Sequence, residues 1–391
     1  MKKMLTGCFM GGFLFLCLCG VGHAGVKVGG VLGAEAWYST TSEDMAGGDE
    51  TNEVWLNGGN LLGELNVDYA DDSGAITIHT MIKLDGQRAD QPTNSSNSWR
   101  LADDLYLQQI SINWHVNDAM DFKFGKQNTL IAPFSPRDCD GPVWLSNVGN
   151  LSFYDEIASF RFDYKLSNQL KASFLIGDPD SDNNDSLASV AGAKEENIMP
   201  RIDFSLQYET DSVSIIPAVT FLSQNYDNLP TGYDDTINIW AASLSAEIRL
   251  DALMIRTEGY YGENLGDGNY TGADGFGPYA YQGSSILEGT TIYDTTTYGG
   301  FFELMYTLNE KTQIGGAVSM ATFKNDDAPA NRELDVTDIG YSLTLHYMAL
   351  ANLLIAPQIR IYDFDDSAMV DGVEQDHGTV SEIGFAMVLF F

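Results

Sequence analysis

Apolar and polar residues alternate with a period of two along most of the chain. The clearest run is 61–69, where Leu65, Val67 and Tyr69 alternate with Glu64 and Asp68. This spacing gives a strand one apolar and one polar face. The same pattern recurs at 76–84, 106–114, 120–127, 158–164, 170–176, 202–208, 240–248, 253–258, 298–306, 339–347 and 383–391, and more weakly at 26–38, 213–222, 312–323 and 353–362. The pattern predicts an all-β protein of sixteen strands.

The links between these strands alternate in length. Short links fall near 70–74, 117–119, 166–168, 209–212, 250–252, 309–311 and 348–351. Long links fall near 39–53, 86–103, 128–151, 177–198, 223–236, 262–297, 324–338 and 363–379. An even strand number with short turns on one side and long loops on the other is typical of outer-membrane barrels. We therefore predict a transmembrane antiparallel β-barrel of about 16 strands, with long external loops and short periplasmic turns.

Aromatic residues on the apolar faces separate this interpretation from a soluble β-sandwich. They gather near strand ends, at Tyr69, Trp114, Tyr164, Tyr208, Tyr306 and Tyr347 beside short turns and at Tyr38, Tyr261 and Tyr298 beside long loops. Two aromatic girdles are expected where a barrel crosses the two membrane interfaces. A soluble β-sandwich does not require aromatic residues to gather at both ends of its strands.

The first 24 residues have the composition of a secretory signal peptide. Lys2 and Lys3 precede an apolar run, and the small residues Gly22 and Ala24 follow it. This order predicts export and cleavage after Ala24, so that residues 25–391 form the mature barrel. Bulky residues before Cys17 and Cys19 argue against a lipoprotein. No later apolar run reaches the roughly 20 residues that a membrane helix needs.

Charge and cysteine content narrow the function classes. The chain has 391 residues, with 20 basic against 55 acidic side chains. This balance excludes a nucleic-acid binder that works by neutralising phosphates. After cleavage only Cys139 remains, so no internal disulfide is expected. Acidic pairs such as Asp234-Asp235 fall in the long links. They predict an acidic rim and a mild preference for cations.

The end of the chain carries a resemblance to a known family. Apolar residues occupy alternate positions before a terminal phenylalanine: Phe385, Met387, Leu389 and Phe391. This run resembles the C-terminal assembly signal of Gram-negative outer-membrane proteins. With its sixteen strands, the mature chain resembles a general, trimeric porin. The resemblance implies a homotrimer in the outer membrane, in contact with its lipid and lipopolysaccharide and delivered by the outer-membrane assembly machinery. It also implies passive diffusion of small hydrophilic solutes and ions.

In that family the third external loop folds into the lumen and narrows it. The corresponding link here is 128–151, which contains three prolines that stiffen it and the charged residues Arg137, Asp138 and Asp140. It lacks the usual Pro-Glu-Phe tip, of which Ala132-Pro133-Phe134 is a partial match. The link 262–297 is longer and remains an alternative.

Basic residues on the polar faces of the strands are candidates for the pore lining. Those selected are Lys123, Arg161, Lys171, Arg201 and Arg256. A wide barrel keeps such charges in water, and their sum sets its ion preference. For the trimer contact, we expect Gly29, Val31 and Gly33 of the first strand to form a flat outer surface for a neighbouring barrel.

Signals of chemistry are weak, so we predict neither an enzyme nor a cofactor. Asp376-His377 is the only adjacent acid–histidine pair among the mature histidines, and Cys139 has no evident base. The run 178–189 begins like a calcium loop, but its sixth residue is Asn183 and its twelfth is Ser189. The alternatives that remain are a facilitator specific for one solute class, and a non-transporting adhesive or enzymatic barrel. An energy-coupled receptor would need a plug and about 22 strands.

Overall fold

The computed structural model describes most of the chain after the first 24 residues. It describes residues 25–42, 51–57, 63–71, 73–85, 104–134, 151, 156–178, 187, 190, 193–268, 283–325, 327–329, 334–364, 368–370, 373–375 and 378–391. The predicted signal peptide, Cys139 and the Asp376-His377 pair lie outside these residues. Within the described ranges, no helix is long and apolar enough to cross a membrane.

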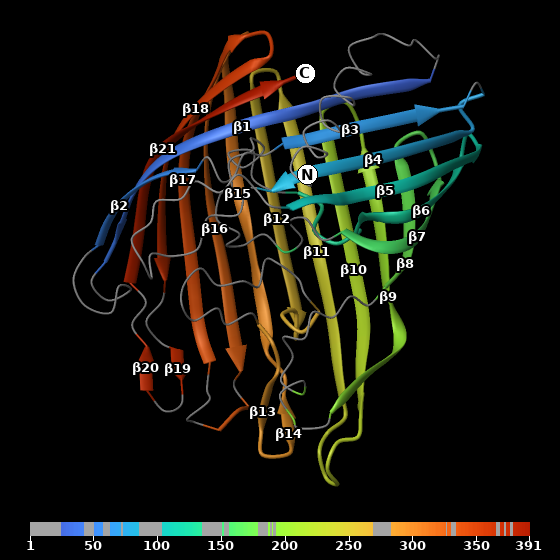
Figure 1. Cartoon of the computed structure of the whole chain (residues 1–391), viewed down its shortest axis with the longest axis vertical. Helices are drawn as coiled ribbons and strands as arrows, with labels where there is room; N and C mark the ends of the chain where they lie inside the picture. Colours follow the sequence, from blue (N-terminus) through green and yellow to red (C-terminus); the bar gives the residue numbers. More distant parts are fainter. Residues whose placement is uncertain are drawn as a thin grey trace, which may run out of the picture.

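The strands form one antiparallel barrel (Figure 1). They are β1 (Val26–Thr41), β2 (Thr51–Asn57), β3 (Gly63–Ala70), β4 (Ile76–Asp85), β5 (Asp104–Asn117), β6 (Met120–Asn128), β7 (Glu156–Lys165), β8 (Leu170–Gly177), β9 (Lys194–Glu209), β10 (Val213–Asp227), β11 (Thr236–Leu250), β12 (Leu253–Glu263), β15 (Thr296–Asn309), β16 (Thr312–Asn325), β17 (Leu334–Leu350), β18 (Leu353–Phe364) and β21 (Gly378–Phe390). Two small hairpins, β13 (Ile286–Glu288) with β14 (Thr291–Tyr293) and β19 (Ala368–Val370) with β20 (Val373–Gln375), lie in the long links.

The predicted barrel of sixteen strands is confirmed. β2 and β3 both pair with β1, at Glu35–Thr41 and at Val26–Leu32 respectively, so together they occupy one position in the wall. The sequence pattern missed β2, and the predicted link 39–53 is too long because strand pairing continues to Thr41 and resumes at Thr51.

The barrel closes where its ends meet. β21 pairs with β1 on one side and with β18 on the other. At the seam, Gly30 N donates to Phe391 O at 2.9 Å and Phe391 N donates to Gly30 O at 3.1 Å. The sheet thus closes on itself, so its first and last strands do not present the unpaired edges that a membrane cannot satisfy.

The short turns are built by local hydrogen bonds, as the turn between β3 and β4 illustrates. Gly74 takes a left-handed φ of 69° and donates its N–H to Asp71 O. The Asp71 carboxylate accepts hydrogen bonds from Ser73 Oγ and Ile76 N. These donors hold the pKa of the Asp71 carboxyl below its ordinary value.

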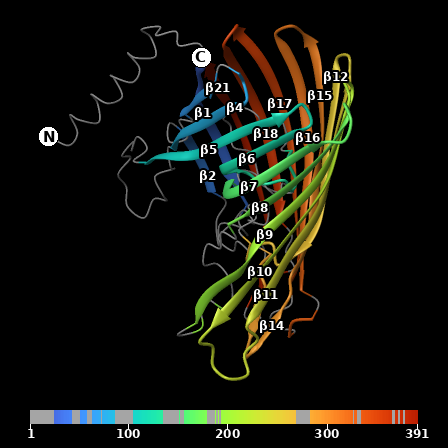
Figure 2. The same ribbon diagram turned by 90° about the vertical axis from the view of Figure 1, so that its right-hand side faces the viewer.

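The wall is not of even height. β3, β4, β6, β7 and β8 have 8 to 10 residues, whereas β9, β10, β11 and β17 have 15 to 17. Figure 2 shows β9–β11 continuing beyond the ends of β5–β8 towards the long-loop side. The tall part of the wall therefore extends past the level at which the short strands end.

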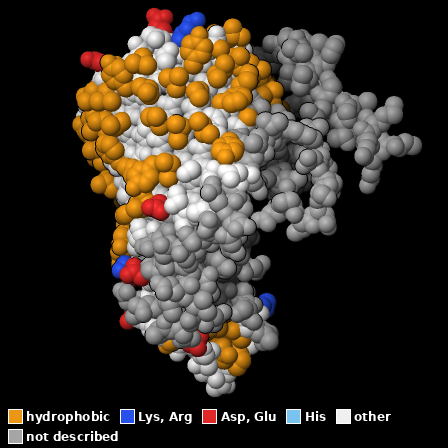
Figure 3. All heavy atoms as spheres, turned by 90° about the vertical axis from the view of Figure 1, so that its left-hand side faces the viewer, with side chains coloured by type: hydrophobic (Ala, Val, Ile, Leu, Met, Phe, Trp, Pro, Cys, Tyr) orange, Lys and Arg blue, Asp and Glu red, His pale blue; other side chains and the backbone are white. Residues whose placement is uncertain are grey.

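The outer face of the barrel is apolar, as the alternation predicts. Large side chains from all around the wall are more than a third exposed, among them Val28, Ile112, Trp114, Phe124, Phe204, Val219, Leu244, Phe302, Leu343 and Ile383. Figure 3 shows one side of this band, with charged side chains at its edges. An exposed apolar belt of this extent is stable only against lipid or another protein.

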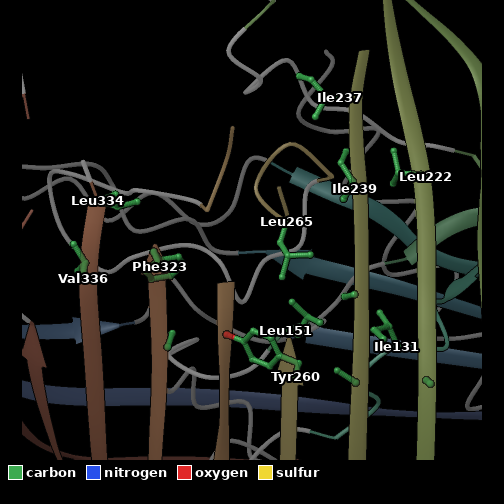
Figure 4. Close-up of a cluster of buried hydrophobic side chains, with 14 of the residues drawn as sticks. Ile131, Leu151, Leu222, Ile237, Ile239, Tyr260, Leu265, Phe323, Leu334 and Val336 are labelled. Atoms are coloured by element: carbon green, nitrogen blue, oxygen red, sulfur yellow. The ribbon is translucent and has the colours of Figure 1, made fainter. Parts of the chain in front are cut away.

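In the tall part of the wall the apolar face changes sides. Ile237 and Ile239 of β11 are buried inside the barrel, while Asn238 between them is exposed outside. They join Leu222, Tyr260 and Phe323 in a cluster completed by residues of the links (Figure 4), namely Ile131, Ala132, Leu151, Leu187 and Leu265. The switch follows from the solvent, since above the lipid level the outer face meets water and the inner face packs.

A buried polar network ties the link between β12 and β15 to the rim of the barrel. Asn264, fully buried, donates from Nδ2 to Asn238 O at 3.0 Å and to Asp294 Oδ1 at 2.7 Å, and accepts from Thr295 N at 2.9 Å. Asp267 accepts from Ser285 N at 2.7 Å. These bonds satisfy backbone groups that no strand ladder pairs.

We expect Asn264→Ala to loosen this link without unfolding the barrel. Each buried group left without a partner costs about 1–3 kcal/mol, so protease cleavage within residues 265–297 of the folded protein should accelerate strongly. Asn228→Ala is the matched control, because Asn228 has a similar left-handed φ, 63° against 56°, but is exposed. Equal cleavage rates in the two variants would show that the network does not hold the link.

Candidate constriction and inner wall

The segment after β6 runs along the inside of the barrel wall. Three of its backbone N–H groups donate to inward side chains: Leu130 to Asp203 Oδ2, Ala132 to Ser243 Oγ and Phe134 to Glu258 Oε2, each at 3.0 Å. These acceptors lie on β9, β11 and β12. The described part of the segment, 129–134, therefore crosses the inner face of four neighbouring strands.

Side chains of the segment also pack against the wall. Leu130 is buried with Ile157 and Leu175, and Ile131 and Ala132 belong to the large interior cluster. The Phe134 ring lies 4.9 Å from the guanidinium carbon of Arg256, a cation–π contact. Apolar contacts on one side and hydrogen bonds on the other fix the path of the segment.

The acceptors are themselves held in place. Asp203 is fully buried and accepts from Thr220 Oγ1 at 2.6 Å and from Arg201 Nε at 3.0 Å. Glu258 is 2% exposed and accepts from Ser245 Oγ at 2.7 Å. A buried carboxylate needs several donors, and here the backbone of the segment supplies one to each.

A network of charges extends from this point towards the short-turn end. Arg256 Nε lies 3.1 Å from Glu247 Oε2, and Arg256 Nη1 lies 3.8 Å from Glu303 Oε2. Arg249 also pairs with Glu247. On this part of the wall, positive and negative groups compensate one another.

The basic residues selected from the sequence all lie on the inner face. Lys123 is on β6, Arg161 on β7, Lys171 on β8, Arg201 on β9 and Arg256 on β12. Arg201 and Arg256 bind wall carboxylates, whereas Lys123 and Lys171 are partly exposed. The loop residues Arg137, Asp138 and Asp140 lie outside the described residues.

The residues of the C-terminal signal lie on the outer face of the last strand. Phe385, Met387, Leu389 and Phe391 are 38% to 59% exposed. They alternate with Ala386 and Val388, which are buried inside. One edge of β21 binds β1, so the signal lies beside the closing seam.

The expectation for Gly29, Val31 and Gly33 is wrong. Val31 packs against the interior cluster of Leu354, Ala356, Ala386 and Val388, and Gly33 is buried. The outward positions of β1 are instead occupied by Val26, Val28, Leu32 and Tyr38. Residues of odd number share the inner face here, so the glycines cannot meet a neighbouring barrel.

Two histidine–carboxylate pairs on the inner wall are absent from the sequence-based candidates. His79 Nδ1 lies 2.7 Å from Asp68 Oδ1, and His115 Nδ1 lies 2.6 Å from Asp121 Oδ1. Each pair joins facing positions of a hairpin, so counting back from the short turns would have found them. Within the described ranges, no hydroxyl or thiol binds either imidazole, and no cluster of metal-ligand residues is present.

Comparison with known proteins agrees with this architecture. Residues 141–385 match the porin subfamily. No curated protein matches the sequence. Among solved structures, the outer membrane channel DcaP of Acinetobacter baumannii is similar, with 14% identity over 94% of this chain and 97% of that one and a TM-score of 0.66.

Two further structures share the fold. The anion-selective porin from Comamonas acidovorans has 9% identity over 94% of this chain and 99% of that one, with a TM-score of 0.58. OmpF of Salmonella typhi has 12% identity over 94% and 97%, also with a TM-score of 0.58. At these identities the likeness establishes the barrel fold alone. The family match covers more than half of the chain, and with the closed sixteen-stranded barrel it identifies this protein as a member of the porin subfamily, a passive channel of the outer membrane.

Proposed function

We propose that the channel passes small hydrophilic solutes and ions by diffusion, with a size limit set by the link 128–151. The observation that supports this is the path of residues 129–134 along the inner wall, held by Asp203, Ser243 and Glu258. A loop fixed inside a barrel reduces its free cross-section, and the charges beside it act on ions that pass. No chemical step or energy source takes part.

A facilitator for one solute class and a non-transporting barrel remain the alternatives, and we propose that the protein is not an enzyme. The family and the fold support a channel. Among the described residues, neither histidine–aspartate pair has a hydroxyl or thiol bound to its imidazole that could act as a side-chain nucleophile.

Export, assembly and partners belong to the same proposal. Residues 1–24 act as a cleaved signal peptide, and the assembly machinery recognises the outward side chains at the end of β21. The mature chain forms a homotrimer in contact with lipid and lipopolysaccharide. One solved structure of similar fold, OmpT of Vibrio cholerae, is described as a trimer form, and the apolar outer belt supplies surface for such contacts.

Single-channel recording in planar bilayers tests the proposed function. The purified mature protein should give steady steps whose size rises in proportion to the KCl concentration. Saturation of the current by one solute class would favour the facilitator, and the absence of any step would leave the adhesive or enzymatic barrel. Cross-linking in mild detergent should give a trimer band, and a monomer band alone would contradict the trimer.

The anchoring of the segment predicts the effect of Glu258→Ala. This variant removes the acceptor of Phe134 N, a charge-assisted hydrogen bond worth about 1.5–3 kcal/mol. The segment should detach more often by roughly tenfold to a hundredfold, which would appear as noise or substates in the open-channel current.

Asp121→Ala is the control for this variant. It removes an inner-wall carboxylate that binds His115 and not the segment. If its current is as noisy as that of Glu258→Ala, the noise comes from wall charge and not from the loss of the anchor.

A further inference from the structure

Like charges face one another on the inner surface of β6–β8. Lys123 lies directly opposite Arg161, and Lys171 lies directly opposite Lys165. Facing residues on neighbouring strands are close in space, and like charges in such pairs destabilise a sheet. Opposite charges would stabilise the same positions. These facing pairs do not stabilise the wall, and their charges remain available to contacts in the lumen.

The carboxylates near these cations are engaged with other groups. Asp163 accepts from Arg161 Nε at 2.8 Å and from Ser173 Oγ, and Asp121 is bound by His115. Within the described part of the chain, no carboxylate oxygen lies within 4.0 Å of the ammonium group of Lys123 or Lys171. Two lysine side chains on the inner wall are thus left without an ion pair.

Arg161 is positioned to present its outer end to the lumen. Its Nε is taken by Asp163, and its terminal Nη atoms make no hydrogen bond within the described ranges. A guanidinium held at Nε keeps a fixed direction, and its two terminal NH2 groups match the spacing of two oxygens of a carboxylate or phosphate. The neighbouring ammonium groups add charge without demanding one geometry.

Lys123 and Arg161 lie in the row of residues where the segment after β6 meets the wall, and Lys171 lies on β8 four residues closer to the short turn. The row of facing residues runs from Lys123 to Arg161, then to Leu175 and Asp203. Leu130 packs on Leu175 and donates its N–H to Asp203. A solute that passes the segment at this level comes within reach of the cations.

We propose that Lys123, Arg161 and Lys171 form a binding site for small oxyanions, that is, for solutes that carry a carboxylate or a phosphate group. This inference rests on the proposed function, since it names the solute class that the channel favours. The acidic links act at the mouth and the cations act inside. Affinity for an oxyanion and the permeability ratio of K⁺ to Cl⁻ are therefore separate quantities.

The test uses the mature protein in planar bilayers at a fixed KCl concentration, with inorganic phosphate in one series and acetate in the other. Each probe should reduce the KCl current to a plateau, which yields an apparent Kd. Lys123→Gln, Arg161→Gln and Lys171→Gln should each raise that Kd about tenfold, the effect of one lost charge-assisted hydrogen bond. Lys311→Gln, which removes the same charge in the exposed turn between β15 and β16, is the matched control and should leave the Kd unchanged.

Arg161→Lys separates bidentate binding from charge alone. This variant keeps the positive charge but removes the planar guanidinium group. The Kd should therefore rise in this variant, though by less than in Arg161→Gln.

The outcomes separate this inference from the proposed function. A plateau with either probe, whose apparent Kd rises in the three Gln variants, supports the binding site. The probe that produces this plateau identifies phosphate or carboxylate as the favoured group. Steady current steps in KCl with no plateau for either probe would overturn the binding site and leave the proposed channel intact. A plateau with the same Kd in the wild type and the Gln variants would do the same. No KCl steps at all would overturn the proposed function itself.

Discussion

Deletion of residues 135–147 raises the single-channel conductance and the largest solute that can pass, if the link 128–151 narrows the lumen. The deletion begins after Phe134, so the anchors at Leu130, Ala132 and Phe134 remain. The barrel and the attachment of the segment are thereby preserved, and only chain between the anchors and β7 is lost. Since conductance follows the free cross-section, a severalfold rise is expected. Liposome swelling with sugars of increasing size measures the size limit.

Deletion of residues 269–281 is the matched control, because it removes the same number of residues from the link 262–297, the other candidate for the constriction. Asn264 and Thr295, which tie that link to the rim, remain. It should leave the conductance unchanged. The reverse result, a rise with 269–281 removed and none with 135–147 removed, would assign the constriction to the link 262–297.

Removal of Phe391 should strongly reduce the amount of protein in the outer membrane of cells while affecting its stability little. The change removes two backbone hydrogen bonds with Gly30 at the seam, together worth about 1–3 kcal/mol. Phe391 is 59% exposed, so the barrel loses little packing. A large loss in cells would therefore reflect recognition by the assembly machinery.

Two measurements separate recognition from stability. Refolding of the truncated protein into detergent, followed by gel mobility, should give a folded barrel. Leu304→Ala, which truncates an equally lipid-facing side chain on β15, should leave the outer-membrane level unchanged. If the truncated protein also fails to refold in detergent, the terminal residue is required for closure and not for recognition.

The period-two alternation determined the strands and their number because it is a local property. One face of every strand meets lipid, so each run of five or six residues carries its own signal, and the seven short turns follow from it. The inward direction of Lys123, Arg161 and Arg256 follows from the same parity. The pattern failed at β2, and it misplaced Gly29, Val31 and Gly33 because the glycines on either side of Val31 have no side chains with which to mark a face.

The path of the segment after β6 was decided by tertiary structure. The acceptors that hold Leu130, Ala132 and Phe134 lie 73, 111 and 124 residues further along the chain. No local pattern relates such positions; only closure of the barrel brings β9, β11 and β12 next to the segment. The facing of Lys123 and Arg161 likewise depends on the register of β6 and β7, which the hydrogen-bond ladder fixes across an intervening link of 27 residues. The sequence alone indicated which charged residues point to the inside of the wall. The register of the strands decided which of these residues lie opposite one another.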